Sequence, residues 1–88
     1  MFQNEEFTGA ISYYNHIVEK ATEHNDDYMK SIIYYSLGLA YIKIDNKPLA
    51  VQNLKKSIEL MEKINTQLDI YPEAIRQLEN IELNWNSR

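Results

Sequence analysis

The stretch SIIYYSLGLAYIKI, from Ser31 to Ile44, decides the fold of this 88-residue chain. Its apolar and aromatic residues return every three or four positions, and this spacing places them along one face of an α-helix. Gly38 lies in the middle of that face. Because a glycine inside a helix costs about 1 kcal/mol relative to alanine, we expect a second helix to approach the backbone closely at this point.

A second helical face follows this stretch after the polar segment 45–48. In that segment Asn46 suits a left-handed or capping conformation, and Pro48 suits the first turn of the next helix. We expect the two helices to pack through seven residues, which are Tyr34, Leu37, Gly38 and Tyr41 on the first and Ala50, Leu54 and Ser57 on the second.

These seven residues resemble the pattern of the tetratricopeptide repeat (TPR), a hairpin of two antiparallel helices. In that family an aromatic residue, leucine, glycine and tyrosine on the first helix pack on small and bulky residues of the second. The frequent closing proline of the family is missing, because Glu62 stands in its place. The resemblance implies an all-α fold in which antiparallel helical hairpins form a short right-handed solenoid.

Helical periodicity predicts about four helices in one domain that spans residues 1–88. The first covers 5–23 with Asn4 as its N-cap, a full repeat covers 27–64, and a capping helix covers 69–85. Asp69 is the expected N-cap of this last helix, and Pro72 falls in its first turn. Ala74, Leu78, Ile81 and Trp85 form its apolar stripe.

The first helix aligns with the helix at 48–64 at a shift of 40 residues, which pairs Ala10 with Ala50 and Ile17 with Ser57. The first helix thus resembles the second helix of a repeat. The usual TPR period is 34 residues, so we expect the turn between repeats to be longer by about six. Repeats of about 40 residues are similar to those of the Gram-positive quorum-sensing peptide receptors of the Rap, NprR and PlcR type. Either the end of a longer array or a small stand-alone protein fits the pattern.

The amino-acid composition and net charge argue against several classes of protein function. The net charge of −4 argues against a nucleic-acid partner, and no apolar run is long enough to span a membrane. The absence of cysteine fits a reducing compartment, so we expect a cytoplasmic location. The two histidines, His16 and His24, are eight residues apart on one helix and suggest a solvated face. We therefore expect no metal site, no cofactor and no catalysis.

A second apolar stripe runs along the central helix on the side opposite the packing face, and Tyr35 is its aromatic member. The family resemblance implies that these positions line a concave groove for partner segments. Either the last helix folds over the stripe or a partner covers it. The predicted groove comprises Ile32, Tyr35, Leu39 and Ile42, with Lys43, Asp69, Glu73 and Arg76 at its rim.

These patterns predict a non-catalytic module that binds a protein or peptide, and the resemblance suggests bacterial cytoplasmic signalling as its setting. The alternative is an oligomerisation module. In that case the outer side of the first helix, with Phe7, Ile11 and Val18, would pair with a second copy of the chain.

Overall fold

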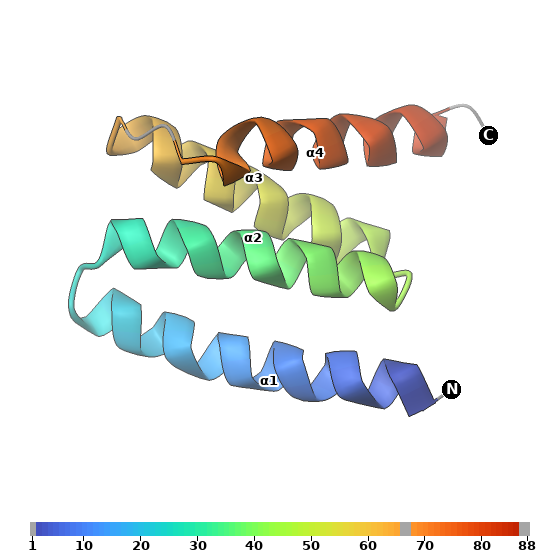
Figure 1. Cartoon of the computed structure of the whole chain (residues 1–88), viewed down its shortest axis with the longest axis horizontal. Coiled ribbons are helices and arrows are strands. Elements are labelled where there is room, and N and C mark those ends of the chain that lie inside the picture. Colours follow the sequence, from blue (N-terminus) through green and yellow to red (C-terminus); the bar gives the residue numbers. More distant parts are fainter. Residues whose placement is uncertain (1, 66–67, 87–88) are drawn as a thin grey trace.

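The computed structural model describes residues 2–65 and 68–86, with side chains for residues 6–65 and 68–83. Within these residues the chain forms four helices and no strand, so the predicted all-α class is confirmed. The helices are α1 (Phe2–Glu23), α2 (Asp27–Lys43), α3 (Lys47–Lys63) and α4 (Ile70–Asn86). Figure 1 shows that each helix runs antiparallel to the one before it. The side chain of Trp85 and the part of the predicted break at 66–67 lie outside the described residues.

The same short turn joins α1 to α2 and α2 to α3. In each turn one residue has a positive φ, Asn25 at 55° and Asp45 at 63°, and the next residue caps the following helix. The side chain of Asp26 accepts a hydrogen bond from the backbone N–H of Met29 at 3.0 Å, and that of Asn46 accepts one from Leu49 at 3.3 Å. Asparagine and aspartate tolerate both conformations, which explains their use in these turns.

Two predictions about helix ends and turns are wrong, and one about the last helix agrees with the structure. The helix α1 begins at Phe2, so Asn4 lies inside it and does not cap it; Gln3 and Glu5 are good helix formers that allow this extension. The turn between α1 and α2 is only three residues long, 24–26, so the longer repeat does not come from a longer turn there. The connection from α3 to α4, by contrast, spans the six residues 64–69, and each of the helices α2 and α3 has 17 residues. The last helix begins at Ile70, directly after Asp69, and contains Pro72 in its first turn as predicted.

The close approach predicted at Gly38 is confirmed. A methyl group at this position would lie 2.7 Å from Cγ and 2.8 Å from Cδ2 of Leu54, and 3.5 Å from the carbonyl oxygen of Ala50. Leu37, Gly38, Ala50, Leu54 and Ser57 are all buried. Tyr34 and Tyr41 are only half-buried, because they lie at the margin of the contact between helices.

A buried hydrogen bond fixes α3 against α2. The hydroxyl of Ser57 donates to the carbonyl oxygen of Ser31 at 2.7 Å, and the hydroxyl of Ser31 donates to the carbonyl of Tyr28. Both serines are fully buried. Because a buried hydroxyl without a partner costs free energy, this pair satisfies the polar atoms that the interface contains.

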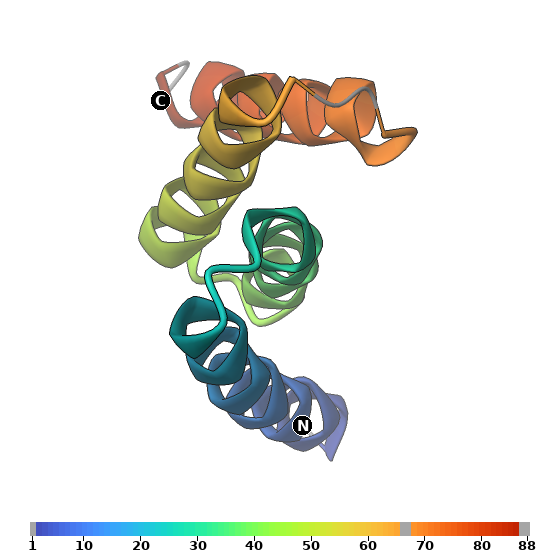
Figure 2. The same cartoon turned by 90° about the vertical axis from the view of Figure 1, so that its left-hand side faces the viewer.

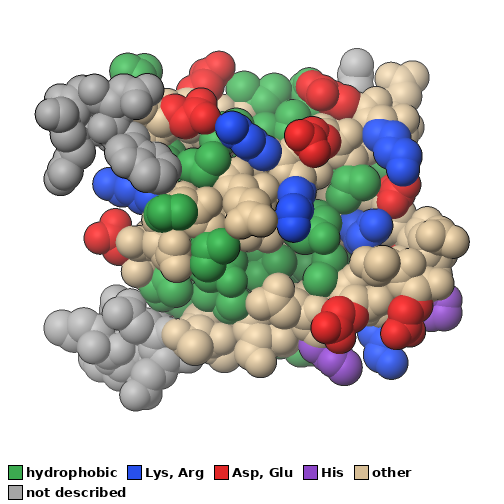
Figure 3. All heavy atoms as spheres, turned by 180° about the vertical axis from the view of Figure 1, so that it is seen from behind, with side chains coloured by type: hydrophobic (Ala, Val, Ile, Leu, Met, Phe, Trp, Pro, Cys, Tyr) green, Lys and Arg blue, Asp and Glu red, His purple; other side chains and the backbone are tan. Residues whose placement is uncertain are grey.

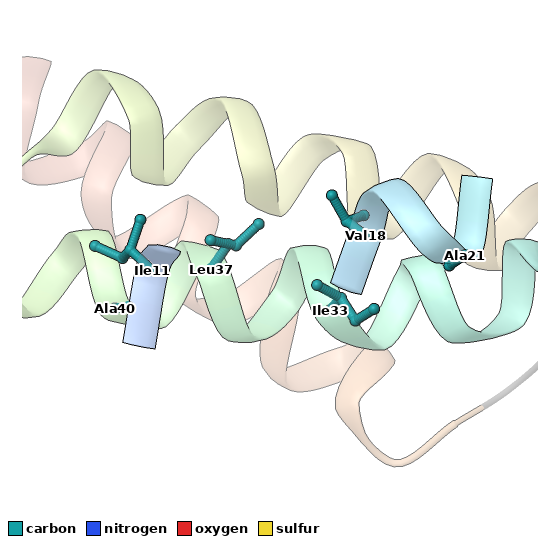
Figure 4. Packing of buried hydrophobic residues seen from close by; sticks show 6 residues of the cluster. All are labelled: Ile11, Val18, Ala21, Ile33, Leu37 and Ala40. Carbon is teal, nitrogen blue, oxygen red and sulfur yellow. The ribbon is translucent and has the colours of Figure 1, made fainter. Parts of the chain in front are cut away.

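The helix α2 takes part in both halves of the core. On one side Ile33, Leu37 and Ala40 meet Ile11, Val18 and Ala21 of α1 (Figure 4). The second cluster lies between α3 and α4, and Tyr35, Tyr41 and Ile42 of α2 pack against it. Figure 2 looks nearly along α2 and shows the other three helices around it, with α1 below, α3 on the left and α4 above.

Candidate binding surface

The predicted groove residues of α2 do not form one open surface, because α4 covers part of it. Tyr35 and Ile42 pack against the cluster formed by α3 and α4. Burial raises the pKa of the Tyr35 hydroxyl, the nearby Glu73 carboxylate raises it further, and Arg76 opposes them. The structure therefore brings together Tyr35, Glu73 and Arg76, and Arg76 forms an ion pair with Glu73. The stripe was expected to be covered either by the last helix or by a partner, and for Tyr35 and Ile42 the last helix contributes to the cover.

Leu39 and Lys43 lie on the other side of α2, where it faces α1. They line an open hollow of about 310 Å³. The other lining residues are Phe7, Ala10 and Tyr14 of α1 and Ser36 and Ala40 of α2. Ile32 is half-buried, and Asp69 is exposed in the connection before α4 and lines neither this hollow nor the next one described. Six of the eight predicted groove residues are thus divided between two sides of α2, and Ile32 and Asp69 line neither hollow.

A second apolar hollow, of about 360 Å³, lies at the opposite end of the same helix pair. Its lining residues are Ile17, Lys20 and Ala21 of α1, His24 and Asp26 of the turn, and Met29 and Ile33 of α2. Most lining residues follow two helical stripes, 7, 10, 14, 17 and 21 on α1, continued by 24 of the turn, and 29, 33, 36, 40 and 43 on α2; Lys20 and Leu39 lie beside these stripes. We therefore treat both hollows as one surface, the α1–α2 groove.

The α1 side of this groove corresponds to the packing face of α3. At the shift of 40 residues Ala10, Tyr14 and Ile17 stand where Ala50, Leu54 and Ser57 stand in α3. The three α3 residues have 0% exposure because α2 covers them, whereas the three α1 residues are only half-buried. No helix of the described chain covers them in the same way.

The prediction that Phe7, Ile11 and Val18 form an open face for a second copy of the chain is wrong about which residues are exposed. Ile11 and Val18 are buried against α2 in the core shown in Figure 4, and only Phe7 of that set remains half-buried at the groove. A helix buries the residues that its neighbour faces, and the hydrophobic period alone did not show which of two adjacent stripes faced α2. The open stripe is the neighbouring one, with Ala10, Tyr14 and Ile17.

A third hollow, of about 290 Å³, is basic and lies between α2 and α3. Lys30, Lys56 and Lys63 line it together with Tyr34, Glu59 and Leu60. Asp27 neutralises part of this charge, because its carboxylate pairs with Lys63 at 3.1 Å and with Lys30 at 3.4 Å. The ammonium of Lys56 lies 5.3 Å from the centre of the Tyr34 ring. Figure 3 shows acidic and basic side chains interspersed over this side of the molecule, which does not form a single basic patch.

The two histidines lie at the surface of α1 and of the turn that follows it. His16 and His24 are both exposed, and among the described residues no three histidine, cysteine or acidic side chains are placed to hold a metal ion. In the same part of the chain none of the helices combines the length and apolar character needed to cross a membrane.

Comparison with protein-family models, with curated proteins and with solved structures finds no match for this chain. The α1–α2 groove is therefore interpreted from its own geometry and chemistry. The sequence did contain a signal for this groove, because Ala10, Tyr14 and Ile17 align with a stripe through which α3 packs on α2. The predicted groove was placed on the stripe of α2 instead.

Proposed function

We propose that this chain is a non-catalytic module that binds a protein or peptide segment in the α1–α2 groove. The observation that carries the proposal is the half-buried apolar stripe of Ala10, Tyr14 and Ile17, whose counterparts in α3 are completely covered. Together with Leu39 and the exposed Met29, this stripe leaves apolar side chains open in two hollows along the seam of the two helices. Contiguous apolar surface of this kind marks interaction sites in soluble proteins.

The seven-residue packing pattern and the confirmed contact at Gly38 support the interpretation of the fold as a TPR-like solenoid. The similarity in repeat length to quorum-sensing peptide receptors supports a place in bacterial cytoplasmic signalling, and the absence of cysteine is compatible with that compartment. We include both in the proposal as its structural and biological setting.

Selection of peptides tests this function directly. A library of random linear peptides is displayed and selected on the immobilised protein, and the binding of recovered peptides is measured by fluorescence anisotropy. We expect Ile17→Glu and Leu39→Glu to weaken binding by about tenfold or more, because each places a charge on the apolar wall.

The matched control is Leu83→Glu, which changes a leucine on α4 that is 68% exposed and outside the groove. It should leave binding unchanged, and circular dichroism checks that all three variants stay folded. The proposed function would be contradicted if the groove substitutions left the affinity of the recovered peptides unchanged, or if the selection recovered no binding peptide.

A further inference from the structure

Resting on the function proposed above, we propose that the occupant of the α1–α2 groove is an amphipathic α-helix with acidic flanks, and that a small residue of this helix faces Tyr14. The molecule contains its own example of such a contact. In that contact α2 lies on the α3 stripe of Ala50, Leu54 and Ser57, which is the stripe repeated on α1 as Ala10, Tyr14 and Ile17.

A helical occupant follows from the backbone of the groove. The walls are two helices whose N–H and C=O groups are used within each helix, apart from those at the helix ends. An extended peptide in an apolar groove of this kind would leave buried backbone groups without partners, and each such group costs free energy. A helix satisfies its own backbone and needs only an apolar face, so the groove favours a helix.

The small residue follows from the size of Tyr14. In the α2–α3 contact the smaller Leu54 already lies so close to Gly38 that a single methyl group there would clash at 2.7 Å. Tyrosine occupies the corresponding position of α1 and is larger than leucine. The residue that faces it must therefore be glycine, as Gly38 is in the α2–α3 contact, if the helix is to reach the stripe.

The acidic flanks follow from the charges at the two ends of the groove. Lys43 lies at one end and Lys20 at the other, and both are exposed. None of the ion pairs within residues 6–65 and 68–83 involves either lysine. The one carboxylate among the lining residues, that of Asp26, lies at the Lys20 end, where it also accepts the hydrogen bond of the α2 cap, so the end with Lys43 has no carboxylate in its lining. Carboxylates on the occupant would complement both lysines.

The same charges disfavour a second copy of this chain. If two grooves met with their ends exchanged, Lys43 of one copy would lie near Lys20 of the other. If they met with their ends aligned, each lysine would lie near its own counterpart. Either arrangement places like charges together in an apolar contact, at a cost in free energy.

The test uses a designed peptide of about 18 residues, which is enough for five helical turns. It carries Tyr, Leu, Gly and Tyr at the spacing of Tyr34, Leu37, Gly38 and Tyr41, on a background of alanine and glutamate. We expect the folded protein to bind it, with a gain of helical circular dichroism in the peptide and NMR shift changes on α1 and α2.

Two changes in the peptide test the two parts of the inference. Replacing the glycine of the peptide by leucine should weaken binding about tenfold or more. Replacing its glutamates by lysines should also weaken binding, and this loss of affinity should be larger at low salt than at high salt. In the protein, the double substitution Lys20→Glu and Lys43→Glu should reverse the charge preference, so that the lysine peptide binds more tightly than the glutamate peptide. The charge-matched control, Lys55→Glu with Lys56→Glu on α3, should not.

Equal binding of the glycine and leucine peptides, or no binding of the designed peptide, overturns the inference. Selected peptides that bind the groove in an extended form overturn it as well but leave the proposed function standing, whereas loss of all groove-dependent binding removes both. Sedimentation that shows a dimer abolished by Ile17→Glu also overturns the inference, because a second copy is then the occupant.

Discussion

Gly38 and Gly9 are both helical glycines, and their surroundings give opposite expectations for the same change. Gly38 faces Leu54 at a distance that excludes a methyl group, whereas Gly9 is exposed and has no atom within 4 Å of an added Cβ. Replacement by alanine should therefore stabilise the fold at position 9, since it removes a helix penalty of about 0.5–1 kcal/mol.

We expect Gly38→Ala to lower the free energy of unfolding by about 1–2 kcal/mol and Gly38→Leu by more, because Leu54 is fully buried and cannot move away freely. Urea unfolding of both variants beside Gly9→Ala measures the difference. A stabilised Gly38→Ala protein would show that the contact between α2 and α3 is looser than described.

Asp27 links the start of α2 to the end of α3 and makes part of the stability depend on pH. The hydrogen bond from Lys63, helped by Lys30, lowers the pKa of the Asp27 carboxyl below its ordinary value of 3.8, although burial opposes the shift. Because the folded pKa is the lower one, the stabilisation is present above pH 3.8 and is lost as the pH falls through the folded pKa.

We therefore expect Asp27→Asn to lower the melting temperature at pH 7 and to match the wild type in strong acid. Thermal unfolding followed by circular dichroism across a pH series checks this. The difference should also shrink with added salt, since these groups are at the surface. A constant difference at all pH values would mean that the effect comes from something other than the carboxylate charge.

At the scale of elements, the two tight turns depend on one side-chain acceptor each. Asn46→Ala removes the bond to the N–H of Leu49 and should cost about 1 kcal/mol in unfolding free energy, whereas Asn46→Asp should cost little because it keeps an acceptor. Denaturant unfolding compares the two. Equal losses in both variants would indicate that the asparagine acts through something other than the cap.

The sequence was sufficient to predict the type and order of the helices, because apolar periodicity and the polar segments around Asp26 and Asn46 agree with each other. It also predicted the contact at Gly38, since an internal glycine needs a structural reason. The start of α1 was missed because Asn4 is equally able to cap a helix or to continue one. The turn before α2 was missed because a repeat length does not say whether its additional residues lie in turns or in helices.

At the scale of the whole molecule, α2 is central and α1 is peripheral. The helix α1 packs on α2, whereas α2 also packs on α3 and touches α4. In stacked helices each element depends on its neighbours, so local opening should begin where one neighbour is lacking. We expect amide hydrogen exchange to be slowest in α2 and α3 and faster in α1, and the designed peptide should slow α1 selectively. Uniform exchange would mean that the whole chain opens in one step.

The position of the groove depended on tertiary contacts that a single sequence does not contain. Tyr35 and Leu39 are four residues apart and were assigned to one surface, yet one packs towards α4 and the other lines the seam with α1. The division arises because α4 lies over only one side of α2. The angle between helices sets that placement, and the apolar pattern of α4 does not determine it.

Two contacts limit how far α3 can slide along α2, the fit of Leu54 against Gly38 and the short turn 44–46, but the remaining apolar contacts would tolerate a small displacement. The bond from Ser57 to the carbonyl of Ser31 removes that freedom, since a displaced α3 would bury its hydroxyl away from this acceptor. The longitudinal alignment of the hairpin thus has a buried polar contact beside the Leu54–Gly38 fit and the short turn, and Ser57→Ala, which fits the same space, should keep the shape of the hairpin and lower its stability.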